Sequence, residues 1–126
     1  MAALVGIKTQ DRPMGEFAFV FRGRDRTRPE QLQRALVNRW AAWMKELDQQ
    51  GRLTNPGQPL QDTGSRVVGR GRVVNDAPFA EIKDVVNGFL VIAAHDLEEA
   101  VEIAKGCPIF DDDGSVEVRP VLQRSL

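Results

Sequence analysis

Two short segments, Glu16 to Arg22 and Gly88 to Ala94, are apolar at nearly every position. In the first, phenylalanines at every second position alternate with alanine and valine, so a strand here is apolar on both faces. The second, GFLVIAA, is apolar without alternation, which is typical of a central strand buried on both faces. A chain with two such strands is predicted to place them in the interior of a layered structure, covered from two sides.

Two helices are predicted, one after each of these strands. The first begins at Pro29, because proline suits the first helical turn, and ends at Gly51. Asp96 and Glu99 form a capping box at the start of the second, and Gly106 ends it. The predicted buried stripes are Leu32, Leu36, Trp40, Trp43 and Leu47 in the first helix, and Leu97, Ala100, Val101 and Ala104 in the second.

The other predicted elements complete an α+β fold. Arg52 to Gly64, rich in proline and glycine, is predicted to be a long loop that serves either as a lid or as a passive connection. Arg66 to Val68 and Arg72 to Asn75 are two short strands joined by a glycine-containing turn, and Ser115 to Val121 is a last, edge-type strand. This order extends the ferredoxin-like βαββαβ arrangement, with an antiparallel sheet, by one short strand.

The predicted fold also indicates that the chain associates with a second copy of itself. Two helices cover only one face of an antiparallel sheet, so the second apolar face needs another partner. The economical partner is a second copy packed sheet to sheet about a two-fold axis, and we expect a homodimer. Residues 1–13 lack periodicity and are predicted to be a flexible extension before a single domain over residues 14–126.

Composition excludes several classes of site. One cysteine and one histidine allow neither an internal disulfide nor the paired spacings of a zinc site, and no metal or cofactor is predicted. The chain has no long apolar run and no basic-then-apolar leader, so a cytoplasmic protein without a membrane span is expected.

Charge is unevenly distributed. Residues 1–72 carry 13 Lys and Arg against 7 Asp and Glu (net +6), and residues 73–126 carry 4 against 11 (net −7). The arginine-rich segment RGRDRTR, residues 22–28, is the natural candidate for a nucleic-acid contact, but no aromatic residue is interleaved for base stacking and an aspartate interrupts it. We favour a solvated loop whose charges face the acidic half of the same chain or of a partner.

Two segments carry a family resemblance. They are Asp76-Ala77-Pro78-Phe79, followed by Glu81, and the predicted strand Glu117 to Val121. Both resemble motifs of the YCII-related family of the DGPF type. The resemblance covers nearly the whole chain and implies a dimeric α+β barrel. It also implies that Trp40 and Cys107 stand where the better-studied branch has a His and an Asp for proton transfer. A Trp and a Cys cannot act together as a His–Asp proton-transfer pair. By the same resemblance, the DGPF type is associated with sigma-factor-like regulators.

These observations leave two functions of different class. We favour a small-molecule-binding or accessory module, linked through the resemblance to transcription regulation, with a pocket near Trp40 between helix and sheet. Its other candidate ligand-binding residues are Asp76, Phe79 and Arg119; Arg119 has the alternative of an ion pair with Glu117.

The alternative function is a lyase or isomerase of small polar organic molecules. Asp76, Glu81 and His95 are its candidates for acid–base catalysis, and His95 also has a structural alternative just before the helix cap. Cys107 follows the end of a helix, whose negative partial charge raises the pKa of a thiol, so an inert core role is preferred to a nucleophilic one.

Overall fold

The computed structural model describes residues 12–24, 27–76 and 82–123. The main sheet consists of β1 (Gly15–Arg22), β2 (Leu53–Pro59), β5 (Val86–Ala94) and β6 (Ser115–Pro120), and the helices are α2 (Glu30–Gln49) and α3 (Leu97–Ala104). Two 3-10 helices, Ile82–Asp84 and Pro108–Asp112, precede β5 and β6.

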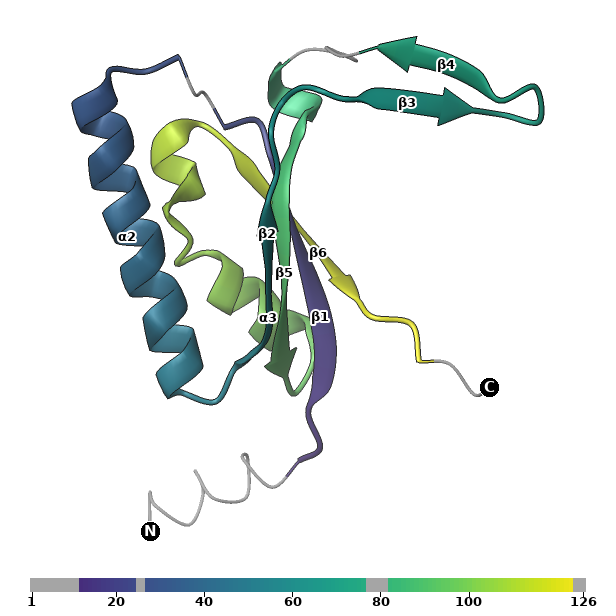
Figure 1. Cartoon of the computed structure of the whole chain (residues 1–126). Helices are drawn as coiled ribbons and strands as arrows, with labels where there is room; N and C mark the ends of the chain where they lie inside the picture. The colour runs from purple at the N-terminus through teal and green to yellow at the C-terminus, as the bar shows by residue number, and fades with distance from the viewer. Residues whose placement is uncertain (1–11, 25–26, 77–81, 124–126) are drawn as a thin grey trace, which may run out of the picture.

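The main sheet is four-stranded and antiparallel, in the order β2-β5-β1-β6. Both α-helices in the described part of the chain lie on one face of it (Figure 1). The connections β1–α2–β2 and β5–α3–β6, with β1 and β5 in the centre, are those of a ferredoxin-like fold. The predicted α+β class is thus confirmed.

The prediction of a long loop over residues 52–64 is wrong, because the first half of this segment forms β2. This strand pairs with β5 along one edge of the sheet, and its register shifts on either side of Asn55. Gly57 has a φ of +61°, and a Cβ there would lie 1.7 Å from the carbonyl oxygen of Phe89. The Asn55 side chain accepts a hydrogen bond from Gly57 N at 2.8 Å. Proline and glycine therefore belong here to an irregular edge strand and not to a lid.

The predicted pair of short strands exists, as β3 (Ser65–Val68) and β4 (Val73–Asp76), but it does not extend the main sheet. The two strands form a separate hairpin, inserted between β2 and β5, that projects away from the helices (Figure 1). Its turn has positive φ at Gly69 and at Arg72. All eight residues of the two strands are exposed.

The core lies between the sheet and the helices. Its buried members are Phe17, Phe19, Phe21, Trp43, Leu47, Leu90, Ile92, Ala94, Ala100, Ala104, Cys107 and Ile109. Three residues of the predicted helix stripes are exposed: Leu32, Leu97 and Val101. In α3 the two alanines of the stripe face the sheet, and their small side chains let the helix lie close to it.

The opposite face of the sheet is also apolar at its centre. Val20 pairs with Phe89 and Ala18 with Val91 across the two central strands. No helix of the described part of the chain covers this face, and Phe89 is 40% exposed although it lies in a central strand. We call this surface the open face. Within the part of the chain that the structure describes, no helix is long and apolar enough to cross a membrane.

Candidate functional site

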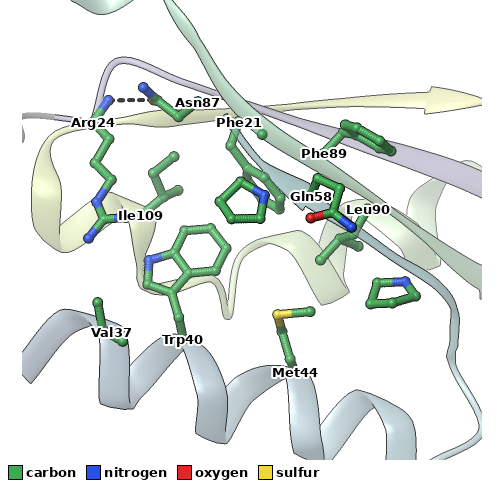
Figure 2. Close-up of a pocket in the computed structure, with 13 residues that line it drawn as sticks. Phe21, Arg24, Val37, Trp40, Met44, Gln58, Asn87, Phe89, Leu90 and Ile109 are labelled. Carbon is green, nitrogen blue, oxygen red and sulfur yellow. Dashed lines mark hydrogen bonds between the residues drawn. The ribbon is translucent and has the colours of Figure 1, made fainter. Parts of the chain in front are cut away.

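A pocket of about 260 Å³ opens between α2 and the β2–β5 side of the sheet (Figure 2). Its walls are apolar and are provided chiefly by Phe21, Val37, Trp40, Met44, Leu90 and Ile109. The volume is just below the roughly 300–1,000 Å³ typical of small-molecule sites. The predicted pocket near Trp40, between helix and sheet, is therefore present in the structure.

Helix α2 presents Val37, Trp40 and Met44 to this pocket because residues three and four apart lie on the same side of a helix. Trp40 packs edge to face on Trp43, with ring centroids 5.8 Å apart. Trp43 in turn belongs to the buried core, so the indole that borders the pocket is supported from behind. The position of this ring is fixed by packing rather than by a hydrogen bond.

The polar groups of the pocket are few. The buried Nε1 of Trp40 has no hydrogen-bond partner among the residues that the structure describes. Arg24 is the one charged side chain among the described lining residues, and Asn87 and Gln58 add amides. Asn87 Oδ1 accepts a hydrogen bond of 2.7 Å from the backbone N–H of Arg24, which holds the backbone of Arg24 against β5 (Figure 2).

Arg24 also belongs to a buried ionic cluster. Asp112, with 1% of its side chain exposed, lies 3.1 Å from Arg24 Nε and 3.0 Å from Arg28 Nε. Arg28 contacts Asp113 as well, at 2.6 Å. A buried carboxylate is stable only when it is paired in this way. Arg24 and Arg28 therefore pair with the acidic half of the same chain, as the favoured interpretation expected, but in a buried cluster and not in a solvated loop.

The sequence-predicted ligand residues other than Trp40 lie away from the pocket or outside the described residues. Asp76 ends β4 on the exposed hairpin, where it accepts a hydrogen bond of 3.1 Å from Ser65. Arg119 lies on β6, 70% exposed, with its Nε 3.8 Å from Glu117, so it makes the predicted alternative ion pair. Phe79, Glu81 and the other residues of 77–81 are outside the described residues.

His95 follows the opposite end of β5 from the pocket and has a structural environment. Its side chain is 4% exposed, and its Nδ1 lies 3.0 Å from Glu99, which also pairs with Arg52. Burial acts to raise the pKa of Glu99, but hydrogen bonds from His95 and Arg52 outweigh it and lower this pKa to about 2. Asp96 caps α3 as predicted, accepting a hydrogen bond from Glu99 N at 2.8 Å.

Cys107 is buried and lies outside the pocket lining. Burial raises the pKa of its thiol to about 12, with a further rise from the charge of Asp111. This agrees with the expected inert thiol, although burial rather than the neighbouring helix end is the main cause. Of the two residues that the resemblance places at the His–Asp positions, only Trp40 borders the pocket.

Sequence reasoning missed Arg24, Asn87 and Ile109 as pocket residues. Arg24 was interpreted only through its charge, and its partner Asp112 is 88 positions away. The signal that was available is the run of three aspartates after the second helix, which offered a partner for an arginine-rich loop. No group of His, Cys, Asp and Glu suited to a metal ion occurs among the described residues.

No curated protein is significantly similar to this chain. The sequence profile of the YCII-related domain matches residues 17–125, which run from within β1 to beyond the end of β6 and include both helices. The match spans the greater part of the chain, and it agrees with the ferredoxin-like order of the main sheet. The chain therefore belongs to the YCII-related domain family.

Proposed function

We propose that this protein is a binding module for a small molecule, which it holds in the pocket beside Trp40. The observation that carries the proposal is the combination of an apolar cavity with a buried indole N–H at its wall that has no partner among the described residues. Cavities of this kind, mostly apolar with a few placed polar groups, are typical ligand sites. A buried donor without an acceptor is unfavourable, and a bound ligand with an acceptor removes that penalty.

The lining supports binding more than acid–base catalysis. Among the described residues that border the pocket there is no Asp, Glu, His or Cys. Of the three candidates for the alternative lyase or isomerase, Asp76 lies on the projecting hairpin and His95 is buried at the far end of β5. Glu81 is outside the described residues. The accessory role beside transcription regulators stays a prediction of the family resemblance.

The proposal is tested by blocking the pocket. In Val37→Trp the new ring should fill the cavity, because Val37 borders it from α2. Ala41→Trp is the matched control, with the same ring added at an exposed position of α2 outside the lining. A fragment library is screened by NMR on isotope-labelled protein. Fragments should shift the Trp40 indole resonance in the wild type and in Ala41→Trp, and not in Val37→Trp. Binding that persists in Val37→Trp, or shifts that map elsewhere, would refute a function in this pocket.

We also propose that two copies associate through the open face. The face is apolar at its centre, where Phe89 is 40% exposed. Next to this centre, β6 carries Glu117 opposite Val20 and Arg119 opposite Ala18, so each copy offers both signs of charge. A two-fold axis brings the same surface of both copies together and can pair these opposite charges. The β3–β4 hairpin projects on the same side of the sheet and would extend the contact (Figure 1).

A further inference from the structure

Trp40 and Arg24 place hydrogen-bond donors at one end of the pocket. Figure 2 shows the indole nitrogen and the guanidinium on the same side of the cavity, with the apolar residues occupying the rest of its wall. The indole N–H is buried and has no acceptor among the described residues. Indole nitrogen and guanidinium donate hydrogen bonds and never accept them. This end of the pocket therefore selects for an acceptor on the ligand.

The ion pair with Asp112 holds the guanidinium of Arg24 in place and leaves its terminal nitrogens available to a ligand. Asp112 contacts its Nε at 3.1 Å, and the backbone of the same residue is fixed by Asn87. The two terminal nitrogens of Arg24 make no hydrogen bond or ion pair with any described residue. A side chain that is already ordered loses little conformational entropy when a ligand binds to its remaining donors.

Charge decides between a neutral and an anionic acceptor. Arg24 is the one charged side chain among the described lining residues, and its partner Asp112, which it shares with Arg28, lies outside that lining. The Arg24 side chain is 17% exposed, so an ion pair formed there is only partly screened by water. Hydrogen bonds to ionised groups are also roughly twice as strong as neutral ones. An anion is favoured at this end over an amide, and a cation is disfavoured.

The other lining residues determine the size and polarity of the part of the ligand that is not the hydrogen-bond acceptor. Phe21, Val37, Met44, Leu90 and Ile109 offer aromatic and aliphatic surface, and the volume is about 260 Å³. Such a cavity takes a compact apolar group and leaves little space for a second polar substituent. We propose that the ligand is a small apolar carboxylic acid, bound as its carboxylate by Trp40 Nε1 and the terminal nitrogens of Arg24, an inference that rests on the proposed binding function of the pocket.

The test uses three acid and amide pairs: benzoate and benzamide, hydrocinnamate and hydrocinnamide, octanoate and octanamide. Binding to the full-length protein is measured by calorimetry, and the two indole N–H resonances are followed by NMR. For at least one pair, the acid should bind about tenfold or more tightly than its amide. The acid should move the indole N–H resonance of Trp40 downfield, and that of the core residue Trp43 much less.

Two variants assign the specificity. Arg24→Gln should weaken binding of the acid by about tenfold or more while changing binding of the amide little. Arg22→Gln is the matched control, since Arg22 pairs with Glu117 and is not part of the lining, and it should bind like the wild type. Trp40→Phe keeps an aromatic ring without the N–H and should also weaken acid binding, which covers the case that Arg24→Gln is too unstable to assay.

The outcomes separate this inference from the proposed function. If amides bind in the pocket as well as their acids, and Arg24→Gln affects neither, the carboxylate inference is overturned and the binding function stands. The carboxylate inference is equally overturned if the Trp40 indole resonance stays unshifted in every acid complex. If neither acids nor amides bind, and the fragment screen also finds nothing in the pocket, the inference and the proposed function fall together.

Discussion

Phe21 of β1 and Trp40 of α2 meet edge to face, with ring centroids 4.8 Å apart and an interplanar angle of 87°. Both rings border the pocket, so this contact ties the central strand to the helix at the cavity wall. Aromatic pairs in this geometry stabilise a fold by about 0.5–1.5 kcal/mol beyond the burial of their surface. Together with Trp43, which also packs edge to face on it, Phe21 holds the indole of Trp40 at the cavity wall.

The ionic cluster behind the pocket should be a major contributor to stability. Asp112→Ala leaves Arg24 and Arg28 without their shared buried partner, and we expect a loss of about 3–5 kcal/mol in the free energy of unfolding. Asp111→Ala removes an exposed ion pair with Arg39 from the same 3-10 helix and should cost less than about 1 kcal/mol. Urea denaturation of both variants measures the difference, and similar values for the two would contradict the cluster's role.

Glu99 should make stability depend on acid pH. Its pKa in the folded protein, about 2, is below the ordinary value of 4.5, so its contribution is complete above pH 4.5 and is lost as the pH falls toward 2. The loss is at most on the order of 3 kcal/mol. Unfolding by urea across this range should show a shallower pH dependence in Glu99→Gln. Glu102→Gln, on the exposed side of the same helix, should keep the wild-type slope.

Cys107 should react slowly with thiol reagents. With its pKa raised to about 12, almost none of the thiol is ionised at neutral pH, and the thiolate is the reactive form. Iodoacetamide should label the native protein far more slowly than a free model thiol, and Cys107→Ser should leave ligand affinity almost unchanged. Labelling faster than the model thiol would show an activated cysteine and would move the enzyme hypothesis ahead of binding.

Substitutions on the two faces of the sheet should have different effects. Phe89→Asp places a charge on the open face and should give a folded monomer, because Phe89 is already 40% exposed in the single chain. Phe19→Asp buries a charge in the core, where Phe19 is 0% exposed, and should prevent folding. Light scattering and circular dichroism distinguish these results. A wild-type protein that has the mass of one chain at all concentrations would rule out the proposed homodimer.

The irregular strand β2 should depend on Gly57. In Gly57→Ala the new methyl group would lie 1.7 Å from the carbonyl oxygen of Phe89, so the pairing of β2 with β5 must give way. Gly51→Ala is the control: Gly51 also has positive φ, but no atom lies within 4 Å of the place that a methyl group would take, so only backbone strain of about 1 kcal/mol is expected. Thermal unfolding should show the larger loss for Gly57→Ala.

Local patterns in the sequence predicted most of the fold. Alternation and apolar runs indicated β1 and β5, and the capping box at Asp96 indicated the start of α3. Strand β2 was missed because its Pro56 and Gly57 disrupt the pattern, and an edge strand tolerates both residues. The hairpin was predicted, but whether two short strands join the main sheet depends on long-range pairing that no local pattern records.

The site was less predictable than the fold. Trp40 was identified, because the resemblance and the helix stripe both led to it. Arg24 was missed because its position depends on Asp112 and Asn87, which are distant in sequence and close only after folding. Asp76 and Arg119 are polar residues beside recognisable motifs, but Asp76 lies on the projecting hairpin and Arg119 on the open face, so neither borders the pocket.

The strand order has a consequence for the growing chain on the ribosome. β1 pairs with β5 and β6, whose residues begin at Val86, and β2 also pairs with β5. β1 is therefore synthesised well before either neighbouring strand, and both of its edges lack a partner during that interval. Exposed apolar strand edges promote aggregation. Synthesis that pauses before Val86 should thus leave a nascent chain that depends on chaperones, whereas the full-length chain released from the ribosome should fold unaided.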